Sequence, residues 1–551
     1  MESVFDILYT LTLISGVSTT VVRYTEKRIR PTVSIVLFDL ISVGLFITLI
    51  FIKLSDIKEL HFSSWDLKGL VYGALFLVFI REYASLRIRY GKSKFNPAQI
   101  FVASFLSIII LGSGMLMLPN STHNGIQYMD ALFTATSAVC VTGLIVVDTG
   151  QHFTTFGQSI ILILIQIGGL GIMTFASYFS YFYKGDSSYE NQLMLTDITN
   201  TKQIGDVFNT LKNIIVVTVS IEAIGAVLIY FSLDFSLLPD TANSSFFAIF
   251  HSVSAFCNAG FSTLTESLYD IGFRFNYPLQ LIIIALFITG GLGFPIVFNL
   301  YKYLKYLISK RIIPFLMRKK SETHIVPWVI NLNSRIVLIT TAILLAVGTA
   351  IVYVFEFNNT LAEHEGYGKM VTALFTASTP RTAGFNSIDF GSLNFSTLMV
   401  IFLLMWIGAS PASTGGGIKT STFAIASLNF WSLARGKDRI EIFRREVADI
   451  SIRRAFAIVS LSLVAIGFGI FFISILDPEK DLLSIAFECF SAYSTVGLSI
   501  GITDQLSQGS RVVIILLMFV GRVGMLYILI AFLRKVRYKN YRYSKEEILI
   551  N

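Results

Sequence analysis

The stretch TSAVCVTGLIV, from Thr136 to Val146, decides how the rest of the sequence is interpreted. It lies between two long apolar segments, and its threonine, cysteine and glycine residues suit neither a membrane helix nor a solvated loop. Irregular backbone at membrane depth is tolerated only where protein or a water-filled cavity covers its carbonyl groups. This stretch therefore predicts a non-helical segment that other parts of the chain must cover.

The same pattern returns three more times along the chain. Each stretch has a Ser six residues before a Gly, and Leu or Phe follows the Gly. A short apolar and aromatic segment of two to three turns precedes each one, which is too short to cross a bilayer. The glycines recur after a little over a hundred residues, so the repeating unit is a span, a short helix, a glycine turn and a second span. The four pairs are Ser137 with Gly143, Ser254 with Gly260, Ser378 with Gly384, and Ser491 with Gly497.

Four such units can cover one another if they surround a common axis. The short helices would then aim the negative C-terminal ends of their dipoles at that axis, and the glycine turns would present carbonyl oxygens to a monovalent cation that sheds its water. Glycine suits such a turn because part of its backbone needs positive φ. The alternative, helix breaks in an inert bundle, does not account for four occurrences in the same topological position.

The composition places the chain in a membrane. Of 551 residues, 54% are hydrophobic and 14% are charged, and the mean hydropathy is +0.69. The net charge of +8 comes from Lys and Arg in short segments between apolar spans, which is typical of cytoplasmic loops and not of a nucleic-acid-binding module. Cys140, Cys257 and Cys489 are too few and too far apart for a disulfide framework or a CxxC metal site.

Eleven apolar segments are candidate membrane crossings, and the third of them is short. If each crosses once, the basic segments between them fall on one side, which predicts an outside N-terminus and a cytoplasmic C-terminus. The segments are 5–22, 33–52, 69–81, 98–118, 157–182, 211–232, 278–300, 335–355, 395–432, 455–476 and 509–533.

One of these segments, 395–432, is too long for a simple crossing and contains GASPASTGGGIKTST from Gly408. Glycine costs about 1 kcal/mol and proline about 3 kcal/mol relative to alanine inside a helix, so the helix is expected to break there. A phosphate-binding loop is an alternative for GGGIKTST, but GxxxxGK[ST] is absent and no strand precedes it. A kink that serves packing alone remains the other interpretation.

Isolated charges at membrane depth are also informative. Arg522 lies in the middle of a predicted span, where an ionised side chain is costly unless it faces water or a partner. We expect it to face the pore as an electrostatic barrier, with Glu488 either as its counter-charge or as a locally hydrogen-bonded carboxylate. Asp130 is expected to be the N-cap of the first short helix. Lys419 either senses the pore or reaches the cytoplasmic interface.

Together these motifs resemble the Trk/Ktr/HKT superfamily of potassium transporters. The four Ser-x5-Gly-[Leu/Phe] turns, GASPASTGGGIKTSTF from Gly408 to Phe423 and GRVG from Gly521 to Gly524 carry the resemblance, with QIGGLGIM and TGGLGFP in the first two units. It extends from about Pro97 to the end of the chain. It implies an all-α polytopic membrane protein with four pseudo-symmetric M1-pore helix-M2 repeats around a central ion pore and about three extra N-terminal transmembrane helices. The implied N-terminal extension covers residues 1–95. The first three repeats cover 96–185, 205–305 and 330–435, and the third of them has a broken second helix. The fourth repeat and the cytoplasmic tail cover 450–551.

The resemblance also assigns roles to residues. The ion selectivity filter would bind K⁺ through backbone carbonyls, and Gly143 matches the potassium-selective members, whereas some sodium-favouring relatives carry Ser there. The loop in the third repeat would obstruct the pore below the filter and act as its gate. The filter residues are Val141, Thr142, Gly143, Asn258, Ala259, Gly260, Thr382, Ala383, Gly384, Thr495, Val496 and Gly497, and the gate residues are Gly408, Ser413, Thr414, Gly415, Gly416, Gly417, Lys419 and Arg522.

The function that follows is potassium uptake across the plasma (inner) membrane. The resemblance implies a homodimer among membrane lipids and a cytosolic nucleotide-binding regulatory subunit of the RCK/KTN type, with K⁺ as the transported ion and no cofactor in this chain. The alternative is a sodium-permeable or Na⁺/H⁺-coupled cation symporter of the same fold. An enzyme is not expected, because the histidines are isolated and form no HExxH or comparable cluster. A ligand-gated receptor or scaffold would need a sizeable extramembrane domain.

Overall fold

The computed structural model describes residues 39, 43–44, 97–171, 207–233, 243–307 and 331–532. Contacts between Cα atoms divide the chain into two units, Met1–Lys94 with Met173–Lys212, and Phe95–Ile172 with Asn213–Asn551. The description below concerns the second unit. The three N-terminal spans predicted from the sequence lie outside the described residues except for Asp39, Val43 and Gly44, and the tail beyond residue 532 lies outside them entirely.

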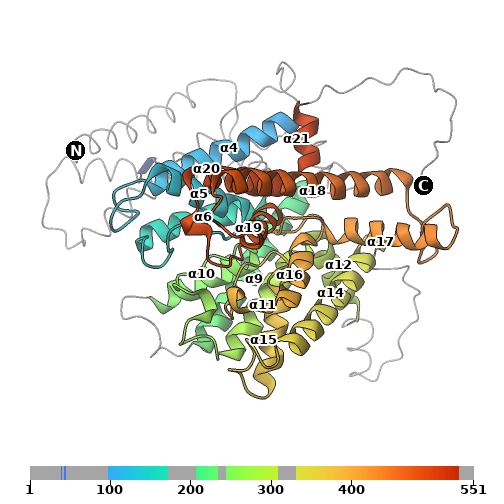
Figure 1. Ribbon diagram of the computed structural model, residues 1–551, viewed down its shortest axis with the longest axis horizontal. Coiled ribbons are helices and arrows are strands. Elements are labelled where there is room, and N and C mark those ends of the chain that lie inside the picture. Colours follow the sequence, from blue (N-terminus) through green and yellow to red (C-terminus); the bar gives the residue numbers. More distant parts are fainter. Residues whose placement is uncertain are drawn as a thin grey trace, which may run out of the picture. The chain divides into compact units, whose positions relative to one another are not determined.

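The described helices follow one order four times: a long helix, a short helix, a non-helical turn and a further helix or pair of helices (Figure 1). The first series is α4 (Pro97–Leu116), α5 (Tyr128–Cys140) and α6 (Thr155–Leu170). The second is α9 (Val207–Ser232), α10 (Ser244–Phe256), α11 (Tyr277–Leu292) and α12 (Phe294–Leu307). The third is α14 (Leu332–Glu356), α15 (Tyr367–Ser378), α16 (Phe395–Trp406) and α17 (Thr420–Ala434). The fourth is α18 (Asp449–Leu476), α19 (Leu482–Ser494), α20 (Gln508–Val523) and α21 (Met525–Phe532).

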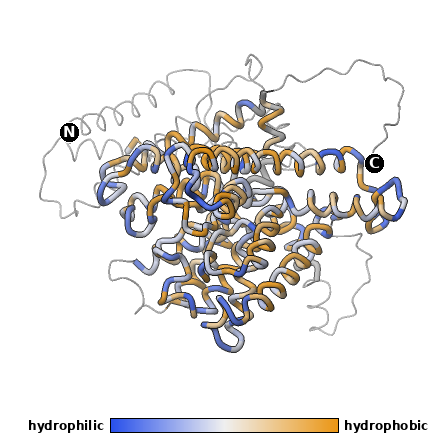
Figure 2. The backbone as a smooth tube through the Cα atoms, viewed as in Figure 1, coloured by the Kyte–Doolittle hydropathy of each residue, from blue (hydrophilic) through white to orange (hydrophobic). Residues whose placement is uncertain are grey.

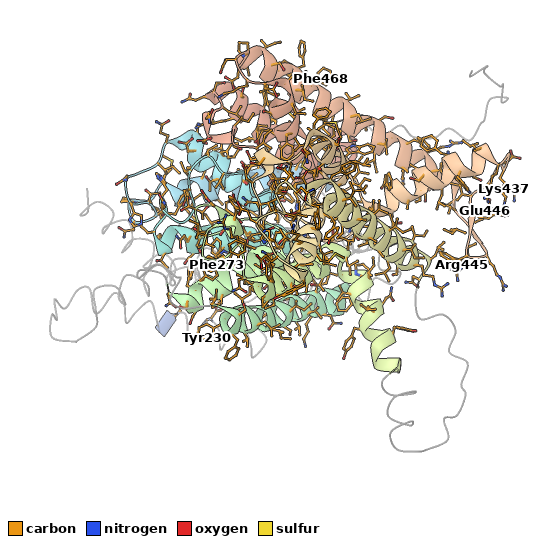
Figure 3. All side chains as sticks on the ribbon, turned by 60° about the horizontal axis from the view of Figure 1, so that its bottom comes forward. Tyr230, Phe273, Lys437, Arg445, Glu446 and Phe468 are labelled. Carbon is orange, nitrogen blue, oxygen red and sulfur yellow. The ribbon has the colours of Figure 1, made fainter. Side chains whose placement is uncertain are left out.

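Very little of the described chain is extended. Strands β1 (Glu441–Ile442) and β2 (Arg445–Glu446) form an antiparallel hairpin between α17 and α18, in which Glu441 pairs with Glu446 and Ile442 with Arg445. Figure 3 shows Lys437, Arg445 and Glu446 gathered around this hairpin. The hairpin falls within one of the basic segments that the sequence predicts to be cytoplasmic.

The helices are apolar enough for a membrane. Among the described residues three helices are long and apolar enough to cross one, at Lys212–Ser232, Leu332–Glu356 and Asp449–Leu476, and the bent pair α11 and α12 is a possible fourth. Their outer faces expose large apolar side chains such as Phe231 and Phe468, and hydrophobic residues dominate the helices while hydrophilic residues gather in the connecting turns (Figures 2 and 3). Such faces suit lipid, so the chain is a multi-pass, all-α membrane protein.

Two predicted spans are broken where the sequence was expected to run straight. Segment 278–300 divides at Gly293 into α11 and α12, which meet at 105°, and segment 509–533 divides at Gly524 into α20 and α21. Both glycines have positive φ, 84° and 89°, which only glycine adopts without cost and which ends a helix. Segment 395–432 breaks between Trp406 and Thr420, as predicted.

Each second helix packs against the short helix of the next series. Helix α6 contacts α10, α11 contacts α15, α16 contacts α19, and α20 returns to contact α5. The chain therefore closes on itself, since its fourth series packs against its first. The four short helices, each 12 or 13 residues long, lie inside this closed arrangement with most of their side chains buried.

A pair of charged residues contributes to the closing contact. The N-cap of α5 is Gln127, which makes no capping hydrogen bond through its side chain, so the predicted N-cap role of Asp130 is wrong. Asp130 lies in the first turn of α5 and pairs instead with Arg511 of α20, whose Nη1 is 2.5 Å from its Oδ1. This ion pair could not be predicted from the sequence, because its two residues come together only when the fourth series packs on the first.

Candidate functional site, a ring of four glycine turns

The turns that follow the four short helices meet one another. A Cβ atom built on Gly143 would lie 2.5 Å from the carbonyl oxygen of Ala259 and 3.1 Å from Cα of Gly260. One built on Gly260 would lie 2.8 Å from Cα of Gly384 and 3.0 Å from the carbonyl oxygen of Ala383. The first turn thus contacts the second, and the second contacts the third.

The remaining two contacts complete a ring. A Cβ on Gly384 would meet the carbonyl oxygen of Val496 and lie 3.5 Å from Cα of Gly497. A Cβ on Gly497 would meet the carbonyl oxygen of Thr142 and lie 2.9 Å from Cα of Gly143. The structure therefore brings together the four glycines that the sequence singles out, in chain order, with the carbonyl before each glycine directed at its neighbour.

Two positive φ angles shape each turn. The glycine is the expected one, but the residue two positions before it also has positive φ, although it is never glycine. Such angles are uncommon for side chains with a Cβ and are a source of strain that surrounding structure must hold in place. The angles are 56° at Val141 and 94° at Gly143, 59° at Asn258 and 70° at Gly260, 69° at Thr382 and 78° at Gly384, and 50° at Thr495 and 89° at Gly497.

The recurrent serine fixes the first and fourth turns in the same way. Ser137 Oγ accepts a hydrogen bond from the backbone N–H of Gly143 at 3.0 Å, and Ser491 Oγ accepts one from Gly497 at 3.1 Å. These serines lie in the last turn of a short helix, so each fastens the glycine to the helix that leads to it. In these two turns the spacing of six residues has this physical cause.

The second and third turns use a different hydrogen bond. Ser254 Oγ donates to the carbonyl oxygen of Phe261 at 2.7 Å, and in the third turn Thr379 Oγ1 donates to Phe385 at 2.5 Å. Ser378, the serine that the spacing selects, instead donates to Leu374 within its own helix. The spacing of serine and glycine is thus the same in all four turns. In the third turn, however, the hydrogen bond to the residue after the glycine comes from Thr379 and not from Ser378.

Several buried polar atoms at the ring have no hydrogen-bond partner among the described residues. They are Thr142 Oγ1, Asn258 Nδ2, Thr382 Oγ1 and Thr495 Oγ1. Buried polar groups are almost always hydrogen-bonded, so an unpaired set at one place is unusual. Three of the four atoms are threonine hydroxyl oxygens on residues that carry, or directly precede, a ring carbonyl, and neutral oxygens of this kind suit a monovalent cation.

Glycines in the second helices allow these helices to pack closely against the short helices that lead into the ring. A Cβ on Gly168, Gly290 or Gly521 would collide with the carbonyl oxygen of Val139, Phe256 or Tyr493 respectively. Each of these carbonyls belongs to the residue four positions before the ring glycine. In three series the second helix therefore contacts the C-terminal end of its short helix through a glycine. This packing role of the glycines in QIGGLGIM and TGGLGFP was not predicted from the sequence.

The glycine-rich segment between α16 and α17 lies against the ring. A Cβ on Gly415 would collide with Thr382 Oγ1, and one on Gly416 would collide with Thr495 Oγ1. Thr414 Oγ1 donates to Asn258 Oδ1 at 2.8 Å. The segment thus touches the second, third and fourth turns at the residue two positions before each glycine.

The segment is also held to itself and to α11. Ser410 N donates to the carbonyl oxygen of Gly291 at 3.0 Å, and Ser413 Oγ donates to Ser410 at 2.6 Å. Lys419 Nζ donates to the carbonyl oxygen of Gly415 at 2.7 Å, so its ammonium binds this segment. Gly408 and Gly417 approach each other closely, since a Cβ on Gly408 would lie 3.1 Å from Cα of Gly417.

Arg522 joins this segment to two helices. Its Nη2 donates to the carbonyl oxygen of Gly168 at 2.5 Å, and its Nη1 donates to that of Thr414. Arg522 directly follows Gly521, the glycine through which α20 contacts its short helix. At the corresponding position, Gly169 follows Gly168 in the first series and Gly291 follows Gly290 in the second. Two glycines and one arginine thus occupy equivalent positions, and the arginine reaches the first and third series, the two neighbours of the fourth.

The scan against family models matches residues 85–541 to TrkH, described as a cation transport protein. The chain belongs to the TrkH family. It is therefore a transporter and not an enzyme, and the resemblance inferred from the motifs is confirmed.

Relatives of the TrkH family align over most of the chain. It is 38% identical to the Ktr system potassium uptake protein B of Bacillus subtilis over 459 residues, which covers 83% of this chain and 97% of the relative. It is 34% identical to the potassium/sodium uptake protein NtpJ of Enterococcus hirae, covering 83% and 98%. The crystal structure of the potassium transporter TrkH from Vibrio parahaemolyticus is similar in fold, with a TM-score of 0.63 at 16% identity, covering 96% of this chain and 97% of that one.

Glu488 has partners of its own in this TrkH-family chain. It is fully buried on α19, and its carboxylate accepts hydrogen bonds from Ser499 and from Thr503 Oγ1, the latter at 3.1 Å. The hydrogen bonds of Arg522 go to carbonyl oxygens. Of the two interpretations left open by the sequence, the structure supports the locally hydrogen-bonded carboxylate.

A cavity of about 310 Å³ opens beside the first and fourth turns. Gly143 and Gly497 line it, as do the side chains of Asp148 and Asp504. Sequence reasoning missed these two carboxylates, because nothing in the spacing of the glycine motif marks them. Carboxylates in a cavity beside the first and fourth turns would attract cations.

Proposed function

We propose that this chain takes up potassium ions across the plasma membrane through the opening enclosed by the four glycine turns. The observation that carries the proposal is the ring itself, in which the carbonyls of Thr142, Ala259, Ala383 and Val496 each point to the glycine of the neighbouring turn. Carbonyl oxygens gathered in such a ring would replace the hydration shell of a monovalent cation. The transported ion is the substrate of the site, and the proposed filter consists of the residues named for it from the sequence.

The neutral character of the ring favours potassium over a divalent ion. Its ligands would be carbonyl and hydroxyl oxygens, and the aspartates nearest to it, Asp148 and Asp504, line the cavity beside the first and fourth turns. Divalent cations prefer carboxylate-rich sites. Relatives named for potassium uptake and for potassium/sodium uptake both align with this chain, so a sodium-permeable or ion-coupled transporter is the second candidate.

We further propose four pseudo-symmetric repeats, 96–185, 205–305, 330–435 and 450–551, preceded by the extension 1–95. The cyclic packing of each second helix on the next short helix supports this division. In the assembly that we propose, two copies of the chain associate and a cytosolic nucleotide-binding subunit controls them. That subunit would bind its own ligand.

The gate is proposed to be the segment from Gly408 to Lys419. Its contacts with Asn258, Thr382 and Thr495 place it against three of the four turns, where it would block an ion leaving the ring. Arg522 fastens it by donating to Thr414. Opening would require this hydrogen bond to break and the segment to move away from the ring.

The function is tested by ion flux into liposomes that contain the purified chain. We expect uptake of ⁸⁶Rb⁺ that external K⁺ inhibits and that an equal concentration of Na⁺ inhibits much less. Equal inhibition by the two ions would favour the sodium-permeable alternative. Liposomes without protein provide the background, and flux no greater than this background in the presence of the regulatory subunit would contradict the proposal.

A further inference from the structure

A buried arginine lies next to the third glycine turn and has no anionic partner in the described part of the chain. Arg381 directly precedes Thr382 and is 9% exposed. Its Nη2 is 3.5 Å from Thr341 Oγ1 on α14, a long hydrogen bond, and its Nε has no hydrogen-bond partner among the described residues. Burial of a charge is costly unless the charge is paired and hydrogen-bonded.

Three other arginines that are wholly or partly buried have strong partners. Arg511 pairs with Asp130, Arg274 pairs with Glu363 at 2.8 Å, and Arg522 binds two carbonyl oxygens. Arg381 has only a neutral hydroxyl at the limit of hydrogen-bonding distance. Its guanidinium therefore has neither strong acceptors nor a negative charge among the described residues.

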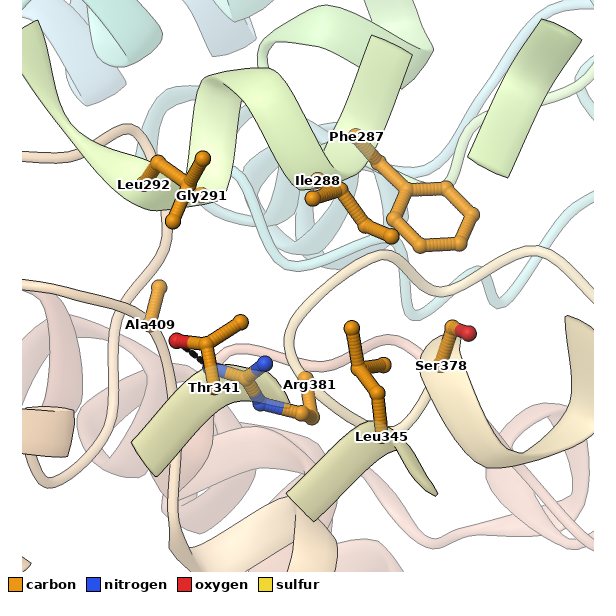
Figure 4. Close-up of a pocket in the computed structure, with 9 residues that line it drawn as sticks. All are labelled: Phe287, Ile288, Gly291, Leu292, Thr341, Leu345, Ser378, Arg381 and Ala409. Atoms are coloured by element: carbon orange, nitrogen blue, oxygen red, sulfur yellow. Dashed lines mark hydrogen bonds between the residues drawn. The ribbon is translucent and has the colours of Figure 1, made fainter. Parts of the chain in front are cut away.

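Arg381 lines a small cavity. Figure 4 shows Phe287, Ile288, Gly291 and Leu292 of α11 on one side of it and Thr341, Arg381, Leu345 and Ser378 on the other, with Ala409 at the edge. The volume is about 20 Å³, which exceeds the roughly 10 to 15 Å³ that a water molecule needs. The rest of the lining is largely apolar. Ser378 donates its hydroxyl hydrogen to Leu374, so it is not available to an occupant.

We propose that this cavity binds a small monovalent anion of the size of chloride, held by the guanidinium of Arg381 and the hydroxyl of Thr341. Water would fill the space but leave the charge uncompensated. A phosphate group or lipid headgroup is too large for the volume and too polar for the apolar lining. The anion neutralises a cationic group that directly adjoins the ring residue Thr382, so it reduces the repulsion that a cation in the ring would experience. The anion site itself does not depend on the ring being the ion path.

The position of the anion is tested by crystallography with bromide. Crystals of the purified full chain are grown in bromide in place of chloride, and anomalous scattering locates the ion. We expect one peak beside the Arg381 guanidinium, absent in Arg381→Gln and retained in the control Arg274→Gln, whose arginine has its own carboxylate. An empty or water-filled cavity in the wild type, or a peak that persists in Arg381→Gln, overturns the proposal.

A second measurement serves if Arg381→Gln does not fold. Anion binding to the native state alone stabilises it by RT ln(1 + [L]/Kd), so Tm starts to rise when the anion concentration reaches Kd and then rises with the logarithm of that concentration. At constant ionic strength, progressive replacement of gluconate by chloride should therefore raise Tm of the wild type. In Thr341→Val, which removes one ligand but little volume, the chloride concentration at which Tm starts to rise should be several-fold higher. Equal Tm values in gluconate and chloride for the wild type, or the same chloride dependence of Tm in Thr341→Val, contradict the proposal.

Discussion

Arg522 Nη2 lies 2.5 Å from the carbonyl oxygen of Gly168, so a side chain from the last series holds the end of a helix from the first. The same guanidinium also donates to Thr414 in the glycine-rich segment of the third series. One residue thus connects three quarters of the ring assembly. In the proposed function, Arg522 would therefore stabilise the position of the proposed gate and place positive charge near the proposed ion path.

Replacement of Arg522 by Gln removes the charge and weakens both hydrogen bonds. We expect the gating segment to detach more often and cation flux without the regulatory subunit to rise about tenfold, equivalent to about 1.4 kcal/mol. The measurement is ⁸⁶Rb⁺ uptake by liposomes that contain the purified variant. The control is Arg453→Gln on the exposed surface of α18, which should leave flux unchanged. Flux equal to that of the wild type would argue against the role of Arg522.

Gly143→Ser tests the ring at its first turn. The new Cβ would lie 2.5 Å from the carbonyl oxygen of Ala259, and φ at this position is 94°, so the turn must shift. We expect the ratio of potassium to sodium flux to fall severalfold because the carbonyl positions change. The matched control is Gly125→Ser, where φ is also positive, 78°, but no atom lies within 4 Å of the added Cβ. Unchanged ion ratios in the ring variant would weigh against the filter assignment.

Gly415→Ala tests whether the glycine-rich segment needs close contact with the ring. A Cβ there would collide with Thr382 Oγ1, so the segment should move away from the third turn. We predict increased basal flux with the ion ratio of the wild type preserved. Gly467→Ala on α18 is the control, because nothing lies within 4 Å of its added Cβ. Reduced flux in Gly415→Ala would mean that the segment shapes the ring and does not obstruct it.

Asp130→Asn tests the closure of the fourth series on the first. Asp130 and Arg511 are largely buried, with side chains 15% and 17% exposed, and breaking such a pair leaves a charge without its partner. We expect a loss of about 2 kcal/mol in the free energy of unfolding, observed as a lower Tm in detergent. Lys437→Ala disrupts an exposed pair with Glu441 and should change Tm little. Similar Tm values for Asp130→Asn and the wild type would show that the pair does not secure the closure.

His364 predicts a dependence of stability on pH. It lies in the turn between α14 and α15, outside both helices, and its Nδ1 is 3.2 Å from the hydroxyl of Tyr277. Burial lowers its pKa below the ordinary value of 6.5, although the Glu363 carboxylate opposes this shift. The folded state then binds fewer protons than the unfolded state, so stability is full above pH 6.5 and decreases as the pH falls toward the lowered pKa.

The measurement is Tm between pH 8 and pH 5 for the wild type and His364→Asn. The difference in Tm between them should change over the interval below pH 6.5, because only the wild type carries this histidine. Two parallel curves over the whole interval would show that His364 does not contribute to the pH dependence.

The sequence was sufficient to predict the glycine turns but not their hydrogen bonds. Spacing selected Gly143, Gly260, Gly384 and Gly497, because positive φ and close approach both demand glycine at these positions. It gave no sign that Val141, Thr382 and Thr495 also have positive φ, since β-branched residues rarely adopt it, and the asparagine that does so more readily, Asn258, was not singled out for this reason. Tertiary contacts hold these residues in place, and single-sequence patterns do not report such contacts.

Helix breaks were predicted only where several breaking residues occur together. The segment at Gly408 combines glycine, serine and proline, whereas Gly293 and Gly524 are single glycines in otherwise apolar spans and were missed. Asp130 was misassigned because N-capping is a local inference, and its true partner Arg511 is 381 residues away. Arg522 was marked correctly as unusual, but its partners are backbone carbonyls, which carry no signal in the sequence.

The ring is tested most directly by locating a heavy potassium analogue in crystals of the purified chain. Thallium or rubidium soaked into crystals should give an anomalous peak on the axis between the four turns, bounded by the carbonyl oxygens of Thr142, Ala259, Ala383 and Val496. The peak should weaken in Gly143→Ser. If the ion binds elsewhere, or no peak lies between the four glycines although the crystals carry the ion, the central claim is contradicted.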